Sequence, residues 1–224
     1  MLQWNHLENA EVLARTAAER IVQIAHKATV RRGCFTLVLA GGGTPMATYA
    51  LLANERLDWS NWHIYFGDER CLPVDHPDRN SAMAKQTLLD RVPIPSGQIH
   101  PIPAELGAEQ GADAYSEVIR SVMPFDLVLL GLGEDGHTAS LFPGQQEAGP
   151  GPAVPVYQAP KPPAERISLT AEALSSCWEL LFLVSGSGKQ AAVRRWRRGE
   201  ILPVSRIHPQ GESEVLIDQQ AAAP

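Results

Sequence analysis

Short apolar segments alternate with helical segments along most of this chain, and this alternation restricts the folds open to it. Four segments have the length and β-rich composition of buried strands: residues 34–40, 62–66, 125–132 and 178–184. Helical spacing or helix signals mark residues 8–30, 46–53, 81–89, 109–122 and 188–196. Strands that alternate with helices are typical of a sheet covered by helices on both faces. We therefore predict an α/β fold with a mostly parallel central sheet.

Only one stretch departs from this pattern in composition. Residues 143–166 are rich in Pro, Gly and Gln, and they are too few to separate two domains, so we predict a long surface excursion. The last six residues, QQAAAP, are predicted to be frayed. With 224 residues, the chain fits a single domain spanning residues 1–224.

Composition excludes several classes of protein. The net charge of −6 argues against a general surface for nucleic acid or anionic membrane. The three cysteines have no metal-ligand or disulfide-framework spacing, so no metal site is predicted. The N-terminus lacks the pattern of a signal peptide, and no apolar run reaches the ~20 residues of a membrane span. We expect a cytoplasmic protein with no nucleic acid or membrane partner and no obligatory protein partner.

Each of the four predicted strands is followed by a polar cluster that contains glycine. The clusters are Gly41-Gly42-Gly43-Thr44-Pro45, Gly67-Asp68-Glu69-Arg70, Gly133-Glu134-Asp135-Gly136-His137 and Ser185-Gly186-Ser187-Gly188-Lys189. The carboxyl ends of parallel strands share one edge of the sheet, where ligands usually bind. One cluster alone is a weak signal, but four on one edge predict a ligand crevice.

The first cluster has two readings. Gly42 and Gly43 let the backbone approach an anion, the helix that follows offers free N–H groups, and Thr44 supplies a hydroxyl near the cap position. Alternatively, the loop is a tight turn with an ordinary cap. It matches neither the lysine-bearing phosphate loop of nucleotide-binding proteins nor their G-x-G-x-x-G pattern.

Charged residues in and near the other clusters are ambiguous one by one. Lys189 lies near a helix start, where it opposes the helix dipole, and contact with a phosphate would explain it. Arg166 suits phosphate as well, although the residue taken alone reads more simply as a surface arginine. Asp68 and Arg70 either both point into the crevice or pair with each other.

His137 is the sharpest candidate for chemistry. A lone histidine is more often a packing or surface residue than a catalyst, but this one follows two carboxylates at the end of a buried strand. Histidine exchanges a proton near neutral pH, and Asp135 can orient its ring or raise its basicity. We therefore predict that His137 is a general base.

Five stretches in this order resemble the 6-phosphogluconolactonase family: AGGGTPMATYALL, FGDERCLPVDHPDRN, LLGLGEDGHTASLFPG, PPAERISLT and LFLVSGSGKQ. The resemblance covers essentially the whole chain. It implies a three-layer α/β/α sandwich with a Rossmann-like sheet, related to glucosamine-6-phosphate deaminases and ribose-5-phosphate isomerases. It also implies hydrolysis of 6-phospho-D-glucono-1,5-lactone, a small phosphorylated sugar lactone, in the oxidative pentose phosphate pathway, without a metal or an organic cofactor.

The resemblance also implies residue roles. His137 would activate water against the lactone carbonyl and Asp135 would support it, while Arg70 would lie near the sugar or the developing oxyanion. The 6-phosphate would be bound by Gly42, Gly43, Thr44, Arg166 and Lys189.

Three positions depart from the pattern of the resembled family. Ala40 and Gly43 stand where that pattern has serines, and Ser81 stands where it has a tyrosine. Phosphate binding would then depend more on backbone N–H groups and on Thr44.

Two alternatives remain. A sugar-phosphate isomerase or deaminase of the same fold would carry Asp-Glu-Tyr where this chain has Asp68-Glu69-Arg70, and a polar, Glu-containing loop in place of residues 138–143. A non-catalytic sugar-phosphate sensor would keep the phosphate loop but would not need His137.

Overall fold

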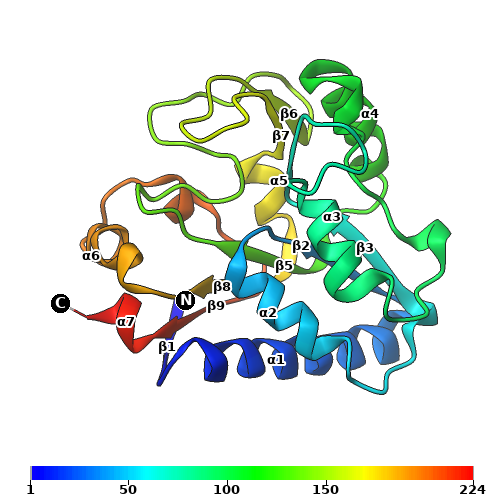
Figure 1. The fold of residues 1–224 in the computed structure, drawn as a ribbon. Coiled ribbons are helices and arrows are strands. Elements are labelled where there is room, and N and C mark those ends of the chain that lie inside the picture. Colours follow the sequence, from blue (N-terminus) through cyan, green and yellow to red (C-terminus); the bar gives the residue numbers. More distant parts are fainter. Residues whose placement is uncertain (1, 224) are drawn as a thin grey trace.

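A computed structural model of the protein describes residues 2–223, and its centre is a six-stranded sheet in which every pairing is parallel. The strand order is β1-β9-β8-β5-β2-β3 (Figure 1). The strands are β1 (Leu2–Leu7), β9 (Glu212–Asp218), β8 (Cys177–Val184), β5 (Phe125–Gly131), β2 (Phe35–Leu39) and β3 (Trp62–Phe66). The four strands predicted from the sequence are neighbours in this order, and the predicted α/β fold is confirmed.

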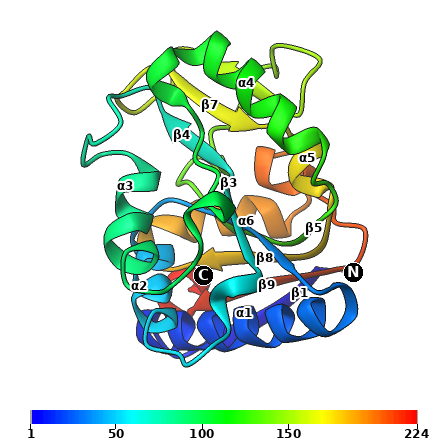
Figure 2. The ribbon, with the colours of Figure 1, turned by 90° about the vertical axis from the view of Figure 1, so that its right-hand side faces the viewer.

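Helices cover both faces of the sheet. The longest helix, α1 (Ala10–Arg32), runs along one face with α2 (Gly43–Leu52) beside it, and α5 (Ala171–Ser175) and α6 (Gln190–Arg197) lie on the other (Figures 1 and 2). The remaining α-helices are α3 (Asn80–Ala84), α4 (Ala108–Arg120) and α7 (Gln219–Ala222). Lys85–Leu89 continues α3 as a π-helical turn, and short 3₁₀ turns span Trp59–Asn61, Ser96–Gln98, Ala104–Leu106, Ser187–Lys189 and Pro203–Arg206. None of the described helices is both long and apolar enough to cross a membrane.

Local signals explain both ends of α1. The side chain of Asn9 caps the helix by accepting hydrogen bonds from the backbone N–H groups of Glu11 and Val12, both at 3.0 Å. Gly33 ends it in the left-handed conformation (φ 78°) and donates its N–H to the carbonyl of Thr29. The predicted helix therefore forms, shifted by two residues at each end.

A second, smaller sheet lies above the central one. It is antiparallel, in the order β4-β7-β6, and comprises β4 (Asp68–Arg70), β7 (Arg166–Leu169) and β6 (Ala153–Val156). Figure 2 shows α4 packed over it, on the side away from α1. The prediction of a long surface excursion over residues 143–166 is therefore partly wrong: Ala153, Val154 and Val156 are buried in β6, which the surrounding prolines and glycines concealed.

The C-terminal segment is also more ordered than predicted. Asp218 caps α7, accepting a 2.8 Å hydrogen bond from the backbone N–H of Ala221, and Ala221 is fully buried. The prediction of a frayed tail is therefore wrong for Gln219–Ala222, and Pro224 lies outside the described residues.

Candidate active site

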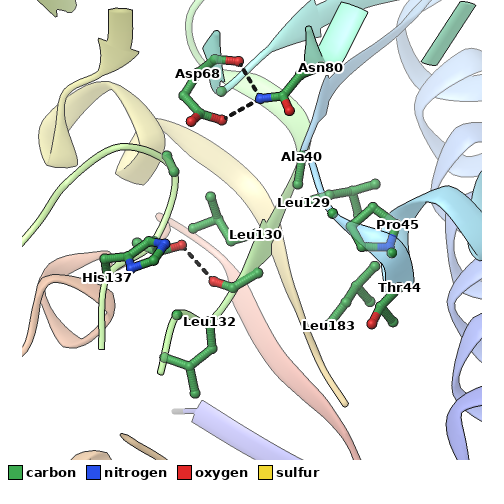
Figure 3. A pocket seen from close by; sticks show the side chains of 18 of the residues that line it. Ala40, Thr44, Pro45, Asp68, Asn80, Leu129, Leu130, Leu132, His137 and Leu183 are labelled. Carbon is green, nitrogen blue, oxygen red and sulfur yellow. Dashed lines mark hydrogen bonds between the residues drawn. The ribbon is translucent and has the colours of Figure 1, made fainter. Parts of the chain in front are cut away.

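The polar clusters that follow β2, β3, β5 and β8 meet at one edge of the sheet, as predicted. Together with the segment before β7, they line a cavity of about 370 Å³. Its lining includes Gly41–Pro45 after β2, Asp68 and Arg70 after β3, His137 after β5 and Lys189 after β8, with Arg166 from β7. Figure 3 shows Thr44, Pro45, Asp68 and His137 around this cavity. Every predicted site residue except Asp135 lines this cavity directly, and Asp135 contacts it through His137.

The buried side chain of Tyr49 fixes the start of the glycine loop after β2. The Tyr49 hydroxyl accepts a hydrogen bond from the Ala40 N–H and donates one to the Ala40 carbonyl, both at 2.9 Å. Gly42 has a φ of 109°, which favours glycine, and it is the N-terminal cap of α2. Thr44 lies in the first turn of the helix, two positions after this cap and thus close to its predicted position. The first N–H groups of α2 have no partner within the helix and are available to an anion.

His137 and Asp135 form a close pair at the end of β5. Nδ1 of His137 lies 2.6 Å from Oδ1 of Asp135, and the same oxygen accepts the backbone N–H of His137 at 3.0 Å. Burial by itself would raise the pKa of Asp135, but these hydrogen bonds and the nearby imidazole hold that pKa below its ordinary value. An ionised carboxylate only accepts, so Nδ1 of His137 carries a proton and faces Asp135, which leaves Nε2 as the ring atom free to exchange a proton.

Two residues that the sequence did not single out fix the ring of His137. Gly133 lies so close that a β-carbon there would be 2.0 Å from Nδ1. The ring of Phe142 packs on another side, with the ring centroids 4.8 Å apart. Phe142 is itself buried, and the guanidinium of Arg166 lies 5.6 Å from its centroid. Phe142 thus contacts both the histidine ring and the guanidinium.

Asp68 is fixed by neighbours rather than by Arg70. Its Oδ1 accepts a 2.9 Å hydrogen bond from Asn80, and its Oδ2 accepts a 2.5 Å hydrogen bond from the hydroxyl of Ser140. Gly41 packs over this Asn80 side chain, and a β-carbon there would lie 2.1 Å from Oδ1 of Asn80. The alternative in which Asp68 pairs with Arg70 is therefore not observed.

Arg70 and its neighbour Glu69 face different environments. Arg70 lines the cavity and donates from Nη1 to the carbonyl of Asp78. Glu69 is fully buried and accepts the backbone N–H groups of Asn80 and Ser81 at 2.7 and 2.8 Å. Glu69 therefore anchors the start of α3 and does not reach the cavity.

Arg166 is not the surface residue that its isolated sequence context suggested. Only 5% of it is exposed, and it donates from Nη2 to the Lys161 carbonyl at 2.8 Å and from Nε to the Pro163 carbonyl at 3.2 Å. Burial lowers the pKa of its guanidinium, Asp68 counteracts this shift, and Arg70 adds to it. A partly desolvated guanidinium beside a cavity binds an anion more strongly than one in water.

Lys189 is half-buried at the end of the 3₁₀ turn that precedes α6. Burial lowers the pKa of its ammonium group, the carboxylate of Glu134 opposes that shift, and Lys161 adds to it. Lys161 also lines the cavity, and sequence reasoning missed it. The cavity therefore gathers Lys161, Arg166 and Lys189 in a protein whose net charge is −6.

Comparison with known proteins identifies the family. Residues 8–216 match the family described as glucosamine-6-phosphate isomerases/6-phosphogluconolactonase, and the chain belongs to this family.

Among its relatives, the 6-phosphogluconolactonase of Synechocystis sp. is 38% identical, over 96% of this chain and 95% of that protein. The crystal structure of 6-phosphogluconolactonase from Thermotoga maritima is similar with a TM-score of 0.91 at 28% identity, covering 98% of this chain and all of that one. A monomeric glucosamine-6-phosphate deaminase shares the fold, with a TM-score of 0.87 at 24% identity, over 99% of both chains. The fold alone therefore does not choose between the two activities.

Proposed function

We propose that this protein hydrolyses 6-phospho-D-glucono-1,5-lactone to 6-phospho-D-gluconate, a step of the oxidative pentose phosphate pathway. The observation that carries the proposal is the His137–Asp135 pair, which lies at the edge of a cavity lined by Arg70, Lys161, Arg166 and Lys189. The names of the relatives support the same reaction, because the Synechocystis and Thermotoga proteins are both called 6-phosphogluconolactonase.

In the proposed mechanism, Nε2 of His137 takes a proton from a water molecule as the water oxygen attacks the lactone carbonyl carbon. Asp135 holds the proton on Nδ1 and stabilises the imidazolium that forms. The tetrahedral intermediate then collapses, the bond between the carbonyl carbon and the ring oxygen breaks, and the imidazolium returns its proton to that oxygen. The products are a hydroxyl group and a carboxylic acid, which ionises at neutral pH.

The remaining cavity residues bind and orient the substrate. Arg166, Lys189 and the free N–H groups at the start of α2 bind the 6-phosphate, with Gly42, Gly43 and Thr44 forming that end of the cavity. Arg70 is placed near the sugar and stabilises the carbonyl oxygen as negative charge develops on it.

Hydrolysis fits the cavity better than isomerisation or deamination does. Apart from His137, a base that moves a proton between adjacent carbons would have to be a carboxylate of the cavity. Asp68 is the one carboxylate among the described residues that line the cavity, and both its oxygens already accept hydrogen bonds from Asn80 and Ser140.

The test is the rate of lactone loss with the wild-type protein and with His137→Asn, corrected for spontaneous hydrolysis. We expect a fast wild type and a fall in kcat of about 10²–10⁴-fold in the variant, the usual effect of losing a general base. If the wild type is fast and the His137→Asn variant is equally fast, the mechanism is refuted but the proposed reaction stands. If the wild type is no faster than the background and releases ammonia from glucosamine 6-phosphate, the protein is a deaminase. If it binds 6-phosphogluconate tightly but neither hydrolyses the lactone nor releases ammonia, it is a sensor.

A further inference from the structure

Glu134 has no role in the proposed reaction, although it lies close to Asp135 and Lys189, which do. It directly precedes Asp135, and its side chain is 63% exposed at the rim of the cavity. A β-carbon on Gly188 would lie 3.3 Å from Oε1 of Glu134, so this carboxylate lies over the turn that carries Lys189. The rim at this point is built from segments that are distant in the sequence.

The third such segment carries Lys161. Its Nζ is 3.9 Å from Oε2 of Glu134. That separation exceeds hydrogen-bonding distance, so the two groups attract each other by charge alone. The Lys161 side chain is 67% exposed, and such an ion pair is weak and easily exchanged for another partner.

The backbone of Lys161, in contrast, is held firmly. Its carbonyl accepts the 2.8 Å hydrogen bond from Arg166, and the carbonyl of Pro163 accepts a second bond from the same guanidinium. Two prolines follow Lys161, which restricts the chain further. Lys161 therefore projects an exposed charged side chain from a backbone that is hydrogen-bonded to the buried arginine at the cavity wall.

The charges explain why a carboxylate is useful here. Burial lowers the pKa of Lys189, the carboxylate of Glu134 opposes this shift, and repulsion from Lys161 adds to it. A phosphate monoester brings about −1.5 to −2 charges near neutral pH. It can therefore replace Glu134 as the partner of both ammonium groups.

We propose that Lys161 is a third cationic ligand of the substrate phosphate, and that Glu134 is a counterion which the phosphate displaces. In the structure, Glu134 pairs with Lys161 across the rim. When the phosphate binds beside Arg166 and Lys189, Lys161 leaves Glu134 and contacts a phosphate oxygen. This inference rests on the proposed function, because it concerns the phosphate end of the same cavity.

Calorimetric titration with 6-phosphogluconate tests this exchange without any turnover. We expect Lys161→Met to weaken binding by about tenfold, near the lower limit for a bond to a charged group because the side chain is exposed. Lys161→Arg should restore most of the affinity. Glu134→Gln removes a competitor for Lys161 and should tighten binding by about two- to fivefold, with a smaller gain when Lys161 is already Met.

Matched controls separate this effect from a change in overall charge. Lys85→Met and Glu55→Gln remove the same charges at exposed positions outside the cavity and should leave the affinity unchanged. Gluconate lacks the phosphate, so its weak binding should not respond to any of these variants. Thermal unfolding of each variant checks that the fold is retained.

The proposal is overturned if Lys161→Met binds 6-phosphogluconate as the wild type does, or if Glu134→Gln weakens binding. A wild type that binds neither 6-phosphogluconate nor inorganic phosphate overturns it as well. Lactonase activity distinguishes this failure from failure of the proposed reaction. If the wild type is an active lactonase and the Lys161 variants keep its affinity for 6-phosphogluconate, only the exchange is refuted. If the wild type has no lactonase activity but the variants change that affinity as expected, only the proposed reaction is refuted.

Discussion

The floor and the rim of the cavity are built in contrasting ways. On the floor, hydrogen bonds of 2.5–2.9 Å join His137 to Asp135 and Asp68 to Asn80 and Ser140. The packing around His137 leaves no room for a methyl group at Gly133. On the rim, Glu134 and Lys161 are mostly exposed and 3.9 Å apart. The reacting groups are thus held in one geometry, while the groups that recognise charge are free to exchange partners.

Replacement of Gly133 by alanine should displace the His137 ring on the floor and cause the largest loss of kcat. The added methyl group would lie 2.0 Å from Nδ1 of His137, so the ring must move away from Asp135. We expect kcat to fall by at least about 100-fold, since displacing a general base costs nearly as much as losing it. Steady-state kinetics measure this loss, and circular dichroism checks the fold.

Gly97→Ala is the matched control for that variant. A β-carbon on Gly97 would meet nothing within 4 Å, and the residue lies outside the cavity. Its activity should equal that of the wild type. A Gly133→Ala enzyme with normal kcat would show that the ring position on the floor is not critical.

The Asp135→Asn substitution should have the second-largest effect. An amide in place of the carboxylate no longer stabilises the imidazolium, and we expect kcat to fall by roughly 10–100-fold, less than for loss of His137 itself. The Asp135→Asn enzyme should also lose the fixed tautomer of His137, so its pH–rate profile should shift. An unchanged kcat and pH profile would mean that Asp135 has only a structural role.

The same carboxylate gives a pH dependence of stability. Because the folded pKa of Asp135 is depressed, its contribution to stability is present above the unfolded value of about 4 and disappears as the pH falls through the lower folded pKa. Denaturant unfolding of wild type and Asp135→Asn should therefore differ at neutral pH and converge in acid. A difference that persists unchanged in strong acid would contradict this assignment.

Much of the floor could be predicted from the sequence because its signals are local. Continuous apolar runs mark β2, β3, β5 and β8, and each ends in a polar cluster that a parallel sheet brings to one edge. The pairing of Asp135 with His137 is predictable for the same reason, since the two residues are two positions apart. The role of His137 as a general base gained further support from the family resemblance and awaits its test.

The features that were missed depend on contacts between distant segments. The edge strand β1 is only partly buried and lacks a clear alternating pattern, and prolines and glycines concealed β6. The burial of Arg166 and the position of Lys161 at the cavity arise when the chain before β7 folds back over the end of the central sheet. Phe142 likewise gains its role only because it packs against both Arg166 and His137.

The smallest predicted effect is that of ionic strength, which should act on the exposed rim and not on the floor. Exposed charges are screened by salt, whereas the packed groups around His137 are not. Raising NaCl from about 50 mM to about 500 mM, where the screening length falls below 5 Å, should raise KM for the phosphorylated lactone several-fold and leave kcat nearly unchanged. Glucono-1,5-lactone without phosphate should show no such dependence, and in Lys161→Met the increase in KM should be smaller. A salt effect on kcat instead would place exposed charges in the chemical step and contradict the division between a fixed floor and an adaptable rim.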